Sequence, residues 1–192
     1  MKELFGKIFS DTEIKAWSGL KLHLISVEDQ IIKETIQILA EARVNGGALI
    51  YCFEIPDNLI YWYPKEDINN FFSNLLLSDS ARNAMPELKI GDEFTCQPGF
   101  EQVRPFLFEG DIAESLYYGG AYKKYQGTPT EAMEIARKFC KAIYSERMLD
   151  VGIYKTYDNW TEWFYDVAWD VTWVLFDKSL KRLWVICLTD TD

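Results

Sequence analysis

The run L-W-V-I-C-L, from Leu183 to Leu188, is apolar at every position, so a strand built from it is apolar on both faces. Such a strand belongs in the middle of a sheet, with cover on each side. The residues before it also follow a strand pattern, up to a turn at Asp177-Lys178-Ser179. The sequence therefore predicts a C-terminal β-hairpin over residues 166–188, with its second strand at the centre of a sheet.

The first arm of this hairpin contains a stretch that fits two structures, W-T-E-W-F-Y-D-V-A-W-D-V-T-W at residues 160–173. Asn159 and Glu162 are suited to cap a single helical turn at its start. Beyond Tyr165, apolar residues occupy every second position from 167 to 175, which is the period of a strand. We therefore expect a strand from residue 167 onward.

A strand would keep Asp166 and Asp170 on one face but about 13 Å apart, four steps of roughly 3.3 Å. Glycosidase chemistry needs carboxyl groups about 5 to 9.5 Å apart. The two carboxylates alone are therefore no acid/base pair. An enzyme here would require a third acid within reach of Asp166, such as Glu54, Glu101 or Glu162.

Apolar periodicity predicts helices near residues 27–43, 66–77 and 129–147. The last of these has the clearest start, because Thr128 and Glu131 are spaced as a capping box. A further short helix is expected near residues 4–9.

A second hairpin is expected over residues 48–63, where Pro56-Asp57-Asn58 would form the turn. In the middle of the chain, where prolines and glycines interrupt the pattern, we expect two short strands and a short helix, at residues 93–96, 106–108 and 111–118. Together these elements predict an α+β fold. It is one globular domain over residues 1–192, with a mainly antiparallel sheet, a C-terminal hairpin and about three to five helices.

The chain is acidic, with a formal net charge of −10. Nucleic-acid binding needs a basic footprint, which the sequence lacks, so no nucleic-acid partner is expected. An acidic surface suits a basic protein partner, whose encounter it would steer. No segment approaches the roughly 18 apolar residues of a membrane span. The expectation is a cytoplasmic protein without a membrane partner, and its oligomeric state is left open.

Several kinds of catalytic or cofactor site are excluded by the residues present. His23 is the only histidine, which removes two-histidine metal sites and mechanisms. The glycine-rich phosphate-binding motifs are absent as well. No catalytic residue, metal site or cofactor is predicted. Carboxylate-only binding of Mg²⁺ or Ca²⁺ stays open, but the C-terminal T-D-T-D of residues 189–192 is expected to be a solvated chain end.

The candidate binding residues are aromatic and acidic side chains near the start of the C-terminal hairpin. Aromatic surfaces beside carboxylates suit sugars, cations or an aromatic-anchored protein partner, although aromatic residues of this kind also build cores. The residues are Tyr157, Trp160, Glu162, Trp163, Tyr165, Asp166 and Asp170.

The function expected from these features is that of a non-enzymatic, acidic protein-binding module. It would neutralise a basic partner, in the manner of a bacterial immunity protein. Two alternatives remain open at this point. One is a small enzyme or ligand-binding protein that uses carboxylates and aromatic rings in residues 157–170. The other is a structural subunit of an assembly, which would expose an apolar patch.

Overall fold

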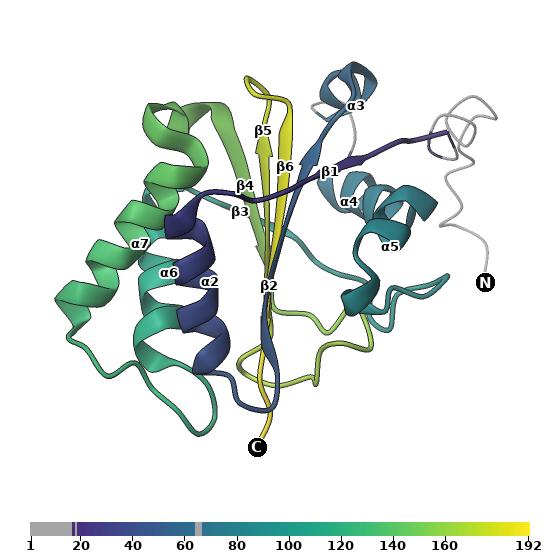
Figure 1. Cartoon of the computed structure of the whole chain (residues 1–192). Coiled ribbons are helices and arrows are strands. Elements are labelled where there is room, and N and C mark those ends of the chain that lie inside the picture. Colours follow the sequence, from purple (N-terminus) through teal and green to yellow (C-terminus); the bar gives the residue numbers. More distant parts are fainter. Residues whose placement is uncertain (1–16, 18, 64–66) are drawn as a thin grey trace.

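The computed structural model describes residues 17, 19–63 and 67–192, so the helix expected near residues 4–9 lies outside the described part. Six strands form one antiparallel sheet in the order β1-β2-β6-β5-β4-β3 (Figure 1). The strands are β1 (His23–Ile25), β2 (Gly47–Glu54), β3 (Glu101–Val103), β4 (Val151–Thr156), β5 (Val171–Asp177) and β6 (Arg182–Thr189). The α+β fold with an antiparallel sheet is thus confirmed.

Helices pack on both faces of the sheet (Figure 1). One face is covered by α2 (Gln30–Glu41), α6 (Pro105–Tyr118) and α7 (Pro129–Tyr144). The other face is covered by α3 (Asp57–Trp62), α4 (Ile68–Leu77) and α5 (Asp79–Ala84). Two 3₁₀ turns, η1 (Pro86–Leu88) and η2 (Ser145–Asp150), complete the helical elements of the described part. The three helices predicted from periodicity are α2, α4 and α7. Among the residues described, no helix has both the length and the apolar content of a membrane span.

The central strand is β6, as its sequence predicts. It pairs with β2 on one side and with β5 on the other. Its side chains alternate between two cores, because Trp184 and Ile186 face the α2, α6 and α7 layer whereas Leu183 and Val185 face the α4 layer. The predicted hairpin of β5 and β6 is confirmed from residue 171 onward.

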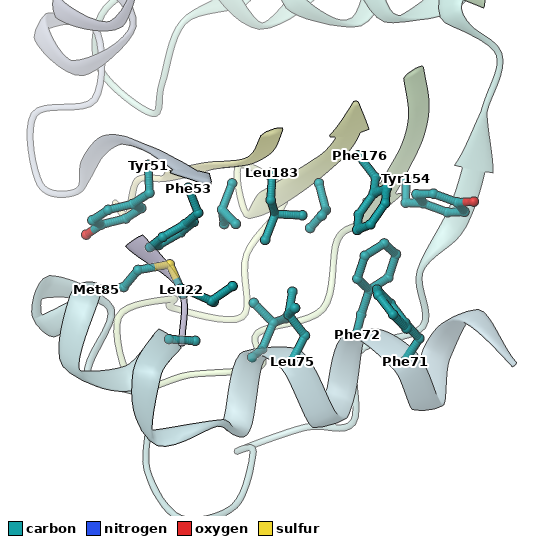
Figure 2. Packing of buried hydrophobic residues seen from close by; sticks show 14 of the residues in the cluster. Leu22, Tyr51, Phe53, Phe71, Phe72, Leu75, Met85, Tyr154, Phe176 and Leu183 are labelled. Carbon is teal, nitrogen blue, oxygen red and sulfur yellow. The ribbon is translucent and has the colours of Figure 1, made fainter. Parts of the chain in front are cut away.

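The core beneath α4 is rich in aromatic rings (Figure 2). Phe71 meets Phe176 edge-on with ring centroids 5.8 Å apart, and Phe72 meets Tyr154 in the same way at 5.0 Å. Tyr63 stacks on Phe176 at 4.2 Å. Such pairs add to the free energy that burial of the rings contributes. This face of the sheet is therefore closed by packed side chains.

The helix starts follow from side-chain capping. The Oγ1 of Thr128 accepts a hydrogen bond from the backbone N–H of Glu131, and the Glu131 carboxylate accepts one from the backbone N–H of Thr128. This confirms the predicted capping box of α7. In α2 the carboxylate of Asp29 accepts from the backbone N–H groups of Ile31 and Ile32, so the helix begins directly after Asp29.

The hairpin expected over residues 48–63 is wrong in its second arm. β2 forms as expected, but residues 57–62 are helix α3. Pro56 has extended backbone and the N–H of Leu59 donates to its carbonyl, which starts a helical turn. Leu59 and Tyr63, one turn apart, are then both buried. A short apolar run such as residues 59–63 fits a strand and a buried helix equally well, and tertiary packing decided here.

Two further expectations in the middle of the chain are wrong. Residues 106–108 belong to α6, whose first position is Pro105, a residue suited to a helix start. Residues 93–96 form no strand, and the backbone N–H of Thr95 instead donates to the carbonyl of Trp160. With α3 and α5 included, the described part of the chain contains six α-helices, where about three to five were expected.

The strand expected from residue 167 begins only at Val171. Residues 157–170 contain no strand and no helix, and Asp166 has a positive φ of 61°, which a strand does not allow. We call residues 157–170 the β4–β5 loop. The alternation of apolar residues at 167 and 169 therefore does not mark a pleated strand, and the polar Asp170 is more buried than either.

Candidate functional site

The β4–β5 loop contains all seven candidate binding residues, but the structure gives them different environments. Trp160 is fully buried, its Nε1–H donates to Thr172 Oγ1 at 2.9 Å, and its ring meets that of Phe94 edge-on. Trp163 is half-buried and packs on Phe164. These two tryptophans are therefore part of the core that supports the loop.

Asp170 is also fully buried and acts as an acceptor for the loop's own backbone. One carboxylate oxygen accepts from the N–H groups of Tyr165 and Val167, at 3.1 and 3.2 Å. The other accepts from the hydroxyl of Thr189. The carboxylate thus satisfies donors that an irregular, buried loop would otherwise leave unpaired.

Three of the remaining candidates, Glu162, Tyr165 and Asp166, are exposed and do not line the cleft that Tyr157 borders. Tyr157 is different. It is exposed at the start of the loop and lines a cleft between the loop and α6, about 290 Å³ in volume. The seven candidate residues therefore do not form one site, and Tyr157 is the one among them that lines this cleft.

The walls of this cleft, which we call the α6 cleft, come from four parts of the chain. α6 contributes Asp111, Glu114 and Tyr118, spaced so that they lie on one side of the helix. The β4–β5 loop contributes Tyr157 and Trp169. β5 adds Trp173, and the segment that follows α2 adds Arg43. Aromatic rings and carboxylates are thus brought together from segments about 40 to 60 residues apart in the sequence, and Arg43 comes from still further away.

A hydrogen-bonded ion pair holds one wall of the cleft. Lys155 Nζ donates to Asp111 Oδ2 at 2.7 Å, and the indole N–H of Trp173 donates to the same oxygen at 3.4 Å. Lys155 also lies over the ring of Tyr157, 5.0 Å from its centroid. Burial lowers the pKa of Lys155, but the bonds to Asp111 and Tyr157 outweigh it and raise the pKa overall. The lysine is therefore charged and neutralises Asp111.

Arg43 lies at the base of the cleft and is only 4% exposed. Its guanidinium donates to the carbonyls of Leu39 and Ser115, which lie in the last turns of α2 and α6. Burial lowers the pKa of Arg43 to about 10, and the charge of Asp190 opposes this shift. Helix C-termini carry partial negative charge, so this cation joins the ends of two helices.

The chain end is more ordered than expected. Asp190 is fully buried, and its carboxylate accepts from the backbone N–H groups of Asn45 and Ala121 at 2.9 and 2.7 Å. The prediction of a solvated end is wrong for this residue, because the carboxylate ties the loops after α2 and α6 together. Those loops follow the helix ends that Arg43 joins.

The segments on either side of the cleft have an unusual charge composition. α6 contains three acidic residues and the β4–β5 loop contains four, and neither contains a lysine or arginine. Glu114 forms no ion pair with any residue that the structure describes. The unpaired charge at the rim of the cleft is therefore negative.

α6 is apolar on its outer side as well. Phe108, Ile112 and Leu116 are buried against the sheet, yet Phe106 is 72% exposed and Leu107 is 58% exposed. We call Phe106, Leu107, Glu114 and Tyr118 the α6 face. Leu107 and Tyr118 are eleven residues apart, three turns, so they lie on the same side of the helix. Leu107, Glu114 and Tyr118 thus lead along one side of the helix into the α6 cleft, and Phe106 lies beside Leu107, about 100° around the helix.

The structure offers little for catalysis in the part of the chain that it describes. No three His, Cys, Asp or Glu side chains gather there in a way that would hold a metal ion. His23 is exposed and lines a second, open hollow near β1. In that hollow Lys181 pairs with Asp57 at 2.7 Å. It lacks the aromatic rings that line the α6 cleft.

A scan against protein-family models found no match, and searches of curated proteins and of solved structures found none either. The function of the chain is therefore inferred from its own geometry.

Proposed function

We propose that this chain is a non-enzymatic binding protein that recognises a basic protein partner through the α6 face. Binding would neutralise the partner, in the manner of a bacterial immunity protein. The observation that supports this most is the outer side of α6. Phe106 and Leu107 are two consecutive large apolar side chains left in water. The other large apolar side chains that the described part of the chain exposes, such as Leu149, are not adjacent to one another in the sequence.

A few buried anchors, aromatic rings prominent among them, supply most of the binding energy in protein interfaces. Burying Phe106 and Leu107 would contribute on the order of 1.5 to 3 kcal/mol each by the usual value for such side chains. Tyr118 and Tyr157 extend the same region with rings that can bury their faces and keep their hydroxyls in water. The region has the composition of an interface centre.

Charge favours a basic partner over a second copy of the same chain. Each copy has a formal charge of −10, and the segments beside the cleft add only acidic residues to the contact region. Two copies meeting through this face would bring like charges together, which costs free energy at an interface. A basic partner would instead be attracted at long range.

The test is capture of partners on the immobilised protein at low and high salt, with three forms compared. These are the wild type, the double variant Phe106→Ser/Leu107→Ser, and the control Leu149→Ser, which alters an equally exposed apolar residue in η2. The proposal expects a basic protein on the wild type and on the control at low salt, reduced at high salt and lost from the double variant. Equal capture by all three forms, or capture that does not weaken with salt, would contradict it.

The α6 cleft also favours a second candidate, a ligand-binding protein or small enzyme acting on a sugar or a cationic small molecule. Its volume of about 290 Å³ and its lining of rings and carboxylates are the supporting observations. A thermal-shift screen of sugars, metal ions and small cations would detect this function. A stable oligomer by light scattering would instead favour a structural subunit.

A further inference from the structure

The size of the α6 cleft limits what can enter it. Its volume of about 290 Å³ is at the lower end of the range of about 300 to 1,000 Å³ that small-molecule pockets span. The exposed rings of Tyr118 and Tyr157 line the cleft. The cleft is therefore suited to one long side chain or a similarly small molecule.

The charged groups of the cleft differ in whether they are free to meet a ligand. Asp111 is paired with Lys155 at 2.7 Å. Arg43 is buried, and its guanidinium donates to two helix carbonyls. Glu114 is exposed and forms no ion pair with any described residue. The charge that a ligand would meet first is the carboxylate of Glu114.

The rings add a second attraction for a cation. Tyr118, Tyr157 and Trp169 come from two segments and line the same cleft. Aromatic rings attract guanidinium and ammonium groups that lie within about 6 Å of the ring centroid. One face of the Tyr157 ring is already taken by Lys155, 5.0 Å from the ring centroid, so a ligand cation would use the other face of this ring together with the rings of Tyr118 and Trp169.

An anionic ligand is less well matched. Arg43 is the only basic residue among those that line the cleft, and its Nε has no hydrogen-bond acceptor among the described residues. That atom is nevertheless buried, so a carboxylate would reach it only after displacing the residues around it. Any anion would also approach Glu114, which would repel it.

We propose that the α6 cleft receives the guanidinium or ammonium group of a basic side chain, with Glu114 as the counter-ion and Tyr118, Tyr157 and Trp169 as the walls. This rests on the proposed function, because the side chain belongs to the basic protein that binds the α6 face. These residues thereby have a specific role in recognising the partner. The acidic composition of the chain, taken alone, indicates only a general electrostatic attraction.

The experiment is an NMR titration of the ¹⁵N-labelled full chain with small probes, followed at the indole N–H signals. The main probe is the capped tripeptide acetyl-Gly-Arg-Gly-amide. Its citrulline analogue has nearly the same shape and no charge, ethylguanidine is a free small cation with the same single charge, and N-acetylglutamate is an anion. The variants are Glu114→Gln and, as a matched control, Glu134→Gln, an exposed glutamate of α7 outside the cleft.

We expect the arginine tripeptide to shift the indole signals of Trp169 and Trp173 and to bind more tightly than the citrulline analogue. Glu114→Gln should weaken its binding about three- to fivefold, as loss of a partly exposed ion pair does. Glu134→Gln should leave it unchanged. Equal binding of the arginine and citrulline tripeptides, or tighter binding of N-acetylglutamate, would overturn the proposal. Tighter binding of ethylguanidine than of the tripeptide would overturn the assignment to a protein side chain.

This result can be separated from the test of the proposed function. If the tripeptide does not bind but capture of a basic protein still depends on Phe106 and Leu107, the cleft proposal fails and the proposed function stands. If the tripeptide binds as expected but no basic protein is captured, the chemistry of the cleft stands and the proposed function fails.

Discussion

Replacement of Asp170 by alanine tests whether the β4–β5 loop owes its shape to one buried carboxylate. In the native chain this carboxylate accepts hydrogen bonds from the backbone N–H groups of Tyr165 and Val167 and from the hydroxyl of Thr189. All three bonds are lost in Asp170→Ala. The loop would keep Trp160 in the core but lose its fixed path toward β5.

The size of the effect follows from these three bonds. A hydrogen bond to a charged group contributes about 1.5 to 3 kcal/mol, and leaving a buried donor unpaired costs about 1 to 3 kcal/mol. The bonds are not independent, so we expect a total loss of about 3 to 5 kcal/mol for Asp170→Ala, as when one partner of a buried charged pair is removed. Asp170→Asn keeps an acceptor for the two backbone N–H groups, and its amide can donate to the Thr189 hydroxyl. We expect it to cost about 1 to 2 kcal/mol.

The assay is urea unfolding followed by tryptophan fluorescence. With a slope of about 2 kcal/mol per molar urea, Asp170→Ala should lower the midpoint by about 2 M and Asp170→Asn by less than about 1 M. The control is Asp166→Asn in the same loop, which removes the same charge from an exposed side chain. Asparagine tolerates the positive φ at this position, so the control should stay within about 0.5 kcal/mol of the wild type.

The reasoning would be refuted if Asp170→Ala and Asp166→Asn shifted the midpoint equally. It would also be refuted if Asp170→Asn were as damaging as Asp170→Ala, because the charge and not the hydrogen-bond geometry would then be decisive.

Three further predictions concern other parts of the chain. Gly46→Ala should destabilise the protein by about 1 to 3 kcal/mol, because the new Cβ would lie 2.1 Å from a backbone oxygen of β6. Gly110→Ala should instead stabilise the protein by up to about 1 kcal/mol in the same urea assay, because the new Cβ would enter open space beside the middle of α6. A thiol reagent at pH 8 should label Cys96 alone in the native protein, because the other three cysteines are buried and burial raises the pKa of each thiol to about 12. Hydrogen bonds from Thr128 lower the pKa of Glu131 below 4.5 in the folded state. The stabilising contribution of the Glu131 carboxylate is therefore present above pH 4.5 and lost as the pH falls below it. The difference in melting temperature between the wild type and Glu131→Gln should accordingly narrow as the pH falls from 7 to 3.5.

The parts of the fold that the sequence predicted correctly are those where local pattern and tertiary packing agree. Residues 183–188 are apolar on both faces and lie in the central strand. Residues 129–144 have a capping box, a proline at the first position and one buried face, and they form α7. The failures are short apolar runs. Residues 58–63 and 106–108 fit a strand by composition, but residues 58–62 form part of α3 and residues 106–108 part of α6. Each helix buries one apolar residue of its run completely, Leu59 in α3 and Phe108 in α6.

The candidate site could be predicted only in part, for a different reason. Tyr157 was among the expected residues and lines the α6 cleft. Glu114 and Tyr118 were missed, because no local pattern places α6 beside a loop 40 residues further along the chain. A signal was nevertheless present. Residues 105–118 contain three acids, no basic residue, and apolar side chains on all sides, a composition that a helix covered on one face alone does not require.

The dense aromatic and acidic residues of the β4–β5 loop explain how an irregular segment can form one wall of a binding cleft. A loop without strand or helix must satisfy its backbone and hold its shape by side chains. Trp160 anchors it in the core, and Asp170 binds its N–H groups from within. With these two fixed, Tyr157 and Trp169 are held against α6 at the two ends of the loop. Trp160 and Asp170 thus support the wall of the cleft and do not themselves contact a ligand. The Asp170→Ala variant, whose loop is loosened, should therefore bind the arginine tripeptide more weakly, although Glu114 and the three rings are all still present.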